Sequence, residues 1–159
     1  MSIICETDNF IVKAATLPHV YVSREEGGHI QIKPKVPVHD RTQLSLDLAT
    51  EYIFLSMVVG ESMQSALGRR GINIGLVNYQ EMGNWSVFKP EGPKMHMHLF
   101  GRAIDAAIQK YGEGVLLPHL DTGFYDAFEP LNDEDIIELR TDIEKLLESE
   151  KYKGRISLK

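Results

Sequence analysis

The chain has 159 residues, of which 43% are hydrophobic and 25% are charged, and these proportions are ordinary for a globular protein with a substantial core. Its formal charge of −6 argues against a general nucleic-acid binder or an acidic-membrane binder, because such proteins usually carry a basic surface. Cys5 is the only cysteine, which excludes a disulfide framework and zinc sites built from Cys-x-x-Cys pairs.

Targeting and membrane segments are not expected from the sequence. The first residues lack the basic start of a signal peptide. The longest apolar-rich stretch, residues 52–59, is too short to span a bilayer. Together with the single cysteine, these features predict a cytoplasmic location.

The first part of the chain is predicted to form strands. Residues 10–15 and 19–23 are rich in β-branched and aromatic residues, and a turn-like Thr-Leu-Pro separates them. Residues 29–33 (HIQIK) alternate strictly between apolar and polar residues. This alternation predicts a half-buried strand with Ile30 and Ile32 pointing into the core, ended by the prolines that follow.

The longest predicted helix covers residues 45–68, where apolar residues recur at helical spacing. Thr42 or Ser45 is expected to cap its start, and Gly68 or Gly71 its end. The helix is apolar on more than one side. It is therefore expected either at a dimer interface or in the centre of a monomer's core.

Further strands are predicted after this helix. Residues 72–79 form one strand and residues 94–100 another, with a loop or hairpin rich in glycine and proline between them. Residues 103–111 give a weak helical signal, and a final amphipathic helix is predicted from about 133 to 150. This order predicts an α+β fold with one long helix, because a doubly wound parallel sheet would require regular alternation of strands and helices.

The predicted strand at residues 94–100 carries two histidines. Because strand side chains alternate, Lys94, His96 and His98 share one face and the apolar residues between them share the other. Three interpretations are open. The histidines are surface residues without a role, they are two ligands of a metal that still needs a third, or they perform nucleophilic or acid–base chemistry.

The sequence resembles the histidine-triad (HIT) superfamily. Its motif is His-φ-His-φ-His-φ-φ, where φ is apolar. The resemblance extends over about residues 6–102, and the matching segments occur in the family's order: E-T-D-N-F-I-V (6–12), G-G-H-I-Q-I-K-P-K (27–35), L-V-N-Y (76–79) and K-M-H-M-H-L-F (94–100). The resemblance implies a HIT-like fold, with an antiparallel sheet, one long central helix and a C-terminal helix.

The resemblance also implies a function and the residues that perform it. Family members cleave nucleotides or dinucleoside polyphosphates at the α-phosphorus through a nucleotidyl-histidine intermediate. His96 matches the attacking histidine, and His98 matches the histidine that contacts a phosphate oxygen. His29 matches the histidine that orients the triad, and Asn78 matches a ligand-side asparagine. Asn84 and Ser86 match loosely the segment that supplies phosphate donors.

Two positions depart from the family pattern. Lys94 replaces the first histidine of the triad, where it either adds positive charge toward a polyphosphate or marks a member that has lost hydrolysis. Pro37 stands where the phosphoramidase branch usually has histidine, which favours the branch that resembles the fragile-histidine-triad dinucleoside polyphosphate hydrolases. The alternative to a hydrolase is a non-catalytic nucleotide-binding protein with the same fold.

The remaining expectations concern organisation and partners. Residues 1–102 are expected to form the HIT-like catalytic core, and residues 103–159 a C-terminal extension of the same domain. The resemblance implies a homodimer that binds a nucleotide or dinucleoside polyphosphate but neither nucleic acid nor a membrane. It implies no required cofactor, although a divalent metal can accompany the nucleotide. His19, His39 and His119 are assigned no role.

Overall fold

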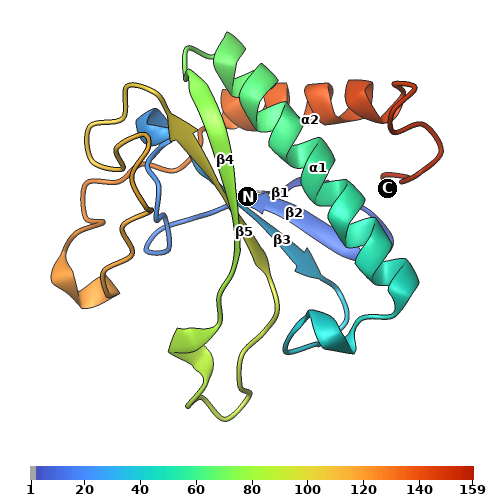
Figure 1. The fold of residues 1–159 in the computed structure, drawn as a ribbon, viewed down its shortest axis with the longest axis horizontal. Helices are drawn as coiled ribbons and strands as arrows, with labels where there is room; N and C mark the ends of the chain where they lie inside the picture. Colours follow the sequence, from blue (N-terminus) through green and yellow to red (C-terminus); the bar gives the residue numbers. More distant parts are fainter. Residues whose placement is uncertain (1–2) are drawn as a thin grey trace.

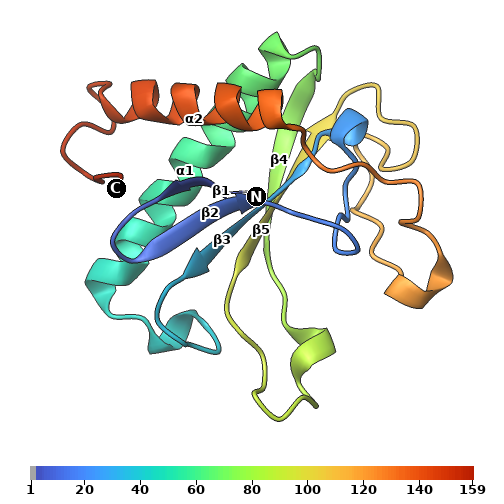
Figure 2. The same cartoon turned by 180° about the vertical axis from the view of Figure 1, so that it is seen from behind.

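The chain folds into a five-stranded antiparallel sheet with two helices on one side and irregular segments on the other (Figure 1, Figure 2). The computed structural model describes residues 3–159. Its strands and longer helices are β1 (Ile3–Glu6), β2 (Phe10–Ala14), β3 (His29–Pro34), α1 (Leu46–Arg69), β4 (Ile74–Glu81), β5 (Met97–Ala103) and α2 (Asp133–Leu147). The predicted α+β class, with one long helix and a C-terminal helix, is confirmed.

The sheet has the order β1-β2-β3-β5-β4. β5, which carries the end of the histidine motif, therefore lies between β3 and β4. Its register pairs His98 with Gln31 of β3 and with Gln80 of β4. Directly paired residues of antiparallel strands share a face, so these three side chains belong to the same side of the sheet.

α1 begins and ends as its sequence predicts. Ser45 is the N-cap, and its side chain accepts a hydrogen bond from the backbone N–H of Leu48 at 3.3 Å. Gly71, with a φ of +84°, follows the helix and adopts the left-handed conformation that favours glycine, whereas Gly68 lies inside the helix. α2 begins at a capping box formed by Asn132 and Asp135.

The main core lies between the helices and the sheet. α1 packs along α2 and against β4, and α2 also contacts β1. The core combines the inward face of the strands with the buried faces of both helices, for example Val12, Ile32, Leu99, Leu55 and Leu139. The alternation of residues 29–33 thus has the predicted orientation, with Ile30 and Ile32 fully buried. Within residues 3–159, no helix combines the length and apolar character needed to cross a membrane.

A second, smaller core covers the opposite face of the sheet. Tyr21 and Phe100 pack there with Tyr125 and Phe128, which belong to the segment before α2. Figure 1 shows this segment, drawn in gold and orange, beside the blue loop that precedes β3. The C-terminal part of the chain therefore contributes to both faces of the sheet.

Two predicted elements do not form. Residues 19–23 are not a strand, because β2 is already paired on both sides, by β1 and β3. Their apolar character reflects burial in the smaller core. Residues 103–111 are not a helix, because the buried carboxylate of Glu26 accepts the backbone N–H groups of Ala107, Ile108 and Gln109 that a helix would have used.

Strand boundaries also differ from the prediction. β1 was not predicted as a separate strand, although it pairs with β2 across a tight turn. β4 and β5 both begin about two or three residues later than expected, at Ile74 and Met97. Lys94 and His96 consequently lie in the extended segment just before β5.

Candidate functional site

Three histidines from two neighbouring strands lie together on the face opposite the helices. His29 begins β3, His98 is in β5, and His96 precedes β5. The ring centroids of His29 and His98 are 5.0 Å apart, and those of His96 and His98 are 4.4 Å apart. The structure thus brings together the three residues predicted to be catalytic.

Hydrogen bonds join these histidines in a defined direction. The backbone N–H of Tyr21 donates to Nδ1 of His29 at 3.3 Å, so a neutral His29 carries its proton on Nε2. That nitrogen is 2.8 Å from Nδ1 of His98 and donates to it. A neutral His98 must then carry its own proton on Nε2, where it is available to an external acceptor.

His96 is oriented by the backbone. Its Nδ1 is 2.7 Å from the carbonyl oxygen of Lys94, which can only accept, so Nδ1 is the protonated nitrogen. Nε2 of a neutral His96 therefore keeps a free lone pair. His29 and His98 are each only 2% exposed, whereas His96 is half-buried. His96 is the most exposed member of the group.

The surroundings lower the pKa of all three rings and so favour their neutral forms. Burial, and then the charge on His96, lowers the pKa of His98 to about 3. Burial and the neighbouring histidines hold the pKa of His29 well below its ordinary value. Burial also lowers the pKa of His96, against the hydrogen bond to Lys94, which raises it. Neutral imidazoles are what the hydrogen-bond chain requires.

Close packing of β3 on β5 sets the distance between His29 and His98. Gly27, just before β3, has a φ of +129°, and a Cβ on it would lie 2.2 Å from the carbonyl oxygen of Gly101. A Cβ on Gly101 would lie 2.0 Å from the carbonyl oxygen of Gly27. Any side chain at either position would push the strands apart.

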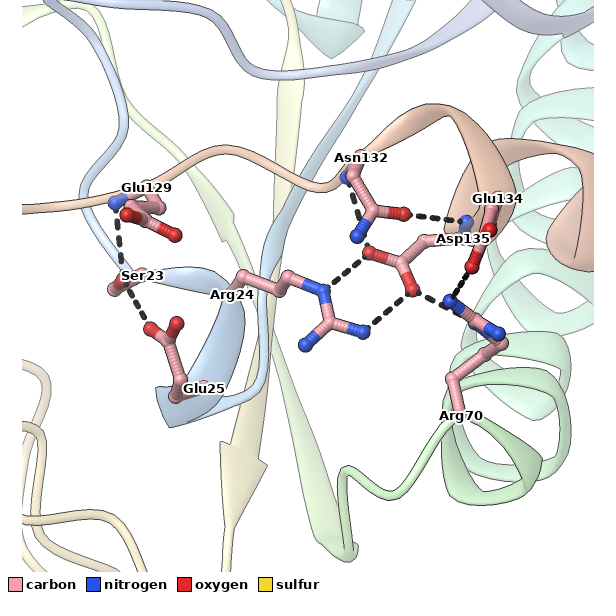
Figure 3. A network of polar contacts seen from close by, with 8 residues as sticks. All are labelled: Ser23, Arg24, Glu25, Arg70, Glu129, Asn132, Glu134 and Asp135. Carbon is pink, nitrogen blue, oxygen red and sulfur yellow. Dashed lines mark hydrogen bonds and ion pairs between the residues drawn. The ribbon is translucent and has the colours of Figure 1, made fainter.

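An ion-pair network around the buried carboxylate of Asp135 holds the loop that leads into β3 (Figure 3). Arg24 donates to both carboxylate oxygens of Asp135, at 2.6 and 2.9 Å, and Arg70 at the end of α1 bonds to the same carboxylate at 3.3 Å. Ser23 accepts from the backbone N–H of Glu129 at 3.0 Å. The loop before His29 is thereby attached to both helices.

Asn78 lies on the same face as the histidines, opposite Phe100 of β5. Its Oδ1 accepts a hydrogen bond of 2.7 Å from Arg102, which leaves its Nδ2 as a donor. Arg102 is 3% exposed and also donates to backbone carbonyl groups of residues 109, 110 and 113. Both residues line a cavity of about 250 Å³ between β4, β5 and residues 111–115.

The other predicted binding residues lie on the rim. Lys94 is exposed, and its carbonyl orients His96. Asn84 is exposed and Ser86 half-buried, at the two ends of a 3₁₀ turn. Trp85 between them packs edge-on to Tyr21 with ring centroids 5.6 Å apart. The side chains of Asn84 and Ser86 make no hydrogen bond within residues 3–159, either to the histidines or to any other residue.

Sequence reasoning missed several residues of this face. Tyr21 supplies the backbone donor to His29 and stacks on its ring at a centroid distance of 5.2 Å. Gln31 and Lys33 follow His29 at alternate positions of β3, and Lys13 of β2 pairs with Gln31. The polar positions of HIQIK alternate with Ile30 and Ile32, and this pattern could have placed Gln31 and Lys33 on the same face as His29. Tyr21 had no such signal.

The histidine group does not have the geometry of a metal site. Within residues 3–159, no three His, Cys, Asp or Glu side chains are placed to hold a metal ion. Nε2 of His29 and Nδ1 of His98 face one another in a hydrogen bond, so they do not converge on a common centre.

Solved structures with a similar fold carry the histidine-triad name. A histidine triad protein from Marinobacter aquaeolei has a TM-score of 0.60 and 16% identity, and the match covers 92% of this chain and 88% of that one. A zinc-bound histidine triad family protein from Mycobacterium smegmatis has a TM-score of 0.59 and 16% identity, with 94% and 90% covered. The chain has the histidine-triad fold. A histidine triad nucleotide-binding protein from Sulfolobus tokodaii matches it with a TM-score of 0.57 and 14% identity, over 92% and 85% of the two chains.

No family model matches the chain, and no curated protein sequence matches it. The histidine-triad fold is therefore established by the arrangement of strands and helices.

Proposed function

We propose that this histidine-triad-fold protein hydrolyses a nucleotide phosphoanhydride or phosphoramidate at the α-phosphorus, with His96 as nucleophile. Pro37 stands where the phosphoramidase branch usually has histidine, and it therefore favours dinucleoside polyphosphates as the substrates. The observation that carries the proposal is the hydrogen bond from Nδ1 of His96 to the carbonyl of Lys94, because it leaves Nε2 of this half-buried ring unprotonated.

The proposed reaction has two displacements. Nε2 of His96 attacks the α-phosphorus and a P–N bond forms, while the bond to the leaving oxygen or nitrogen breaks; the electron pair stays on the leaving atom, and a leaving nitrogen takes up a proton from water. Water then attacks the α-phosphorus of the nucleotidyl-His96, the P–N bond breaks with its electron pair returning to Nε2, and a proton of the water passes to solvent; this releases the nucleotide and restores the neutral imidazole. Dividing one difficult displacement into two easier ones is the advantage of covalent catalysis.

The neighbouring residues have distinct roles in this proposal. His98 donates its Nε2–H to a phosphate oxygen, and His29 is a positioning residue that fixes the His98 tautomer. Asn78, through its free Nδ2, and Lys94, through its charge, are proposed as further contacts to the ligand. Asn84 and Ser86 are proposed to donate to phosphate from the neighbouring 3₁₀ turn. A divalent cation is proposed only as a companion of the nucleotide's phosphates.

The test is turnover of diadenosine polyphosphates and adenosine phosphoramidate by the wild type, His96→Ala and His119→Ala. His119 is a suitable control because it is exposed and paired with Asp121 at 2.8 Å, outside the chain of three histidines. We expect turnover by the wild type and His119→Ala, and none by His96→Ala. Equal activity of His96→Ala would overturn the assignment of the nucleophile.

The alternative is nucleotide binding without hydrolysis, and the lysine at the first triad position is the observation in its favour. Nucleotide-dependent thermal stabilisation of the wild type, without turnover of either substrate, would support this alternative. A cytoplasmic location remains part of the proposal, and it rests on the single, buried Cys5.

We also propose a homodimer formed along β4. This strand is an edge of the sheet, and Leu76 and Tyr79 on it are about half exposed, at 50% and 47%. Ile53 and Met57 of the neighbouring α1 are 45% and 40% exposed. An uncovered edge strand beside exposed apolar residues is suited to pairing with a second copy. Light scattering should give the mass of two chains, and Tyr79→Lys should give one.

A further inference from the structure

Basic residues gather beside His96, on strands that the histidine motif does not include. Lys13 of β2, Gln31 of β3, His98 of β5 and Gln80 of β4 are paired in one row across the sheet. Lys33 stands one register position beyond the pair Ile32–Met97, so it lies at the level of His96. Lys13 and Lys33 therefore point from the same face as the histidines.

Within the described part of the chain, Lys13, Lys33 and Lys94 form no ion pair with an acidic residue. The ion pairs of lysines within residues 3–159 involve Lys35, Lys151 and Lys159 instead. Lys33 is half-buried, and its burial together with the cations of Lys13 and Lys94 lowers its pKa to about 8. Crowding like charges without a counter-ion is unfavourable, so the arrangement costs stability in the empty protein. It does so in a chain whose net charge is −6.

We propose that the face of β2 and β3 formed by Lys13 and Lys33, with Lys94 at its rim, binds a phosphate group other than the one that His96 attacks. The inference rests on the proposed function. It narrows the substrate to compounds with at least two phosphate groups, in which a phosphate chain or a terminal phosphomonoester extends over β2 and β3. Dinucleoside polyphosphates satisfy this condition, whereas a simple nucleoside phosphoramidate does not.

The chemistry of the face favours phosphate over a nucleobase. A nucleobase on the same surface would remove water from two ammonium groups while offering only neutral acceptors, which is costly. Phosphate oxygens accept charge-assisted hydrogen bonds from ammonium groups and neutralise the crowded cations. Gln31, which is paired with Lys13 and lies two residues before Lys33 on β3, adds an amide to the same face, and it is 6% exposed.

The test is binding of inorganic tripolyphosphate by titration calorimetry at fixed ionic strength. Tripolyphosphate carries the phosphate chain without a base or ribose. The variants are Lys13→Gln/Lys33→Gln, Lys13→Arg/Lys33→Arg and the matched control Lys145→Gln/Lys153→Gln. The control changes the net charge by the same amount at two exposed lysines that make no ion pair within residues 3–159. Thermal denaturation of each variant reports on folding.

We expect the Lys13→Gln/Lys33→Gln variant to bind tripolyphosphate about tenfold more weakly, because two half-buried charge contacts are lost. The control pair should change the affinity less than about twofold, and the arginine pair should retain binding because the charges remain. Relief of the charge crowding should leave the melting temperature of the glutamine pair unchanged or higher. Equal affinities of the two glutamine pairs, or no binding by the wild type at millimolar tripolyphosphate, would overturn the subsite.

His96→Ala separates this inference from the proposed function. Tripolyphosphate binding should persist in His96→Ala, because the lysines and not the nucleophile hold the anion. If the wild type binds tripolyphosphate through Lys13 and Lys33 but hydrolyses no nucleotide, the subsite stands and the proposed reaction fails. If hydrolysis depends on His96 but not on the lysine pair, the reaction stands and the subsite fails.

Discussion

Asp135 has a fully buried side chain that connects three parts of the chain (Figure 3). Its carboxylate accepts from Arg24 in the loop before β3, from Arg70 after α1 and from the backbone N–H of Asn132 at the start of α2. Asp135→Asn keeps the size of the side chain and one oxygen for the cap, but it removes the charge. The guanidinium groups of Arg24 and Arg70 then face a neutral amide.

The expected cost follows from the burial of the three groups. Breaking a fully buried ion pair costs about 3–5 kcal/mol. The side chains of Arg24 and Arg70 are 20% and 30% exposed, so water partly solvates them after the change. We therefore expect Asp135→Asn to lower the free energy of unfolding by about 3 kcal/mol. For a chain of this size that corresponds to a fall of about 6–12 °C in the melting temperature.

Urea denaturation at pH 7 measures this difference, and Glu134→Gln is the control. Glu134 bonds to Arg70, but its side chain is 74% exposed, so its loss should cost less than about 1 kcal/mol. A cost for Asp135→Asn no larger than that of Glu134→Gln would refute the reasoning from burial.

The difference in stability between the wild type and Asp135→Asn should also depend on pH. Burial alone would raise the pKa of Asp135, but the bonds from Arg24 and Asn132 outweigh it and lower the pKa from 3.8. A lowered carboxyl pKa contributes stability above the unfolded value, and that contribution disappears as pH falls through the folded value. The wild type and Asp135→Asn should therefore converge in stability below about pH 4.

Three further predictions concern the site and its support. Because the pKa of His96 is lowered from 6.5 and its neutral form attacks, the acid limb of a kcat/KM–pH profile should bend below pH 6.5; a bend above that value would contradict the assignment. His29→Phe removes the donor to His98 and should reduce kcat by up to about a hundredfold with little change in KM, so a change confined to KM in steady-state kinetics would argue against a positioning role. Gly101→Ala should lower the free energy of unfolding by about 1–3 kcal/mol, measured by urea denaturation, because its Cβ would lie 2.0 Å from the carbonyl oxygen of Gly27. Gly68→Ala, which has open space in a helix, should instead raise it by about 0.4–1 kcal/mol. Equal effects of the two changes would show that the close approach of Gly27 and Gly101 is not rigid.

Local patterns were sufficient for much of the fold. The alternation of residues 29–33 gave the inward face of β3, and the polar Ser45 before an apolar helical pattern gave the start of α1. The alternation of residues 94–100 likewise placed His96 and His98 on one face, and their ring centroids are 4.4 Å apart. Signals of this kind depend only on neighbours in the chain, which is why they can be read from a single sequence.

Contacts between distant segments were not accessible in the same way. The bond between His29 and His98 joins residues 69 positions apart, and it depends on the pairing of β3 with β5. The pairing of Glu26 with the backbone of residues 107–109 likewise replaced a helix that the local composition favoured. Residues 19–23 have the composition of a strand because they are buried in the smaller core. In the last two cases a tertiary interaction overrode a local preference.

The most direct test of the central claim is mass spectrometry of the protein quenched during turnover of a dinucleoside polyphosphate. The account predicts a peptide containing His96 that is heavier by one nucleotidyl group, acid-labile as expected of a P–N bond, and absent from His96→Ala. Turnover with no modified peptide at any quench time, or modification on another residue, would contradict the account.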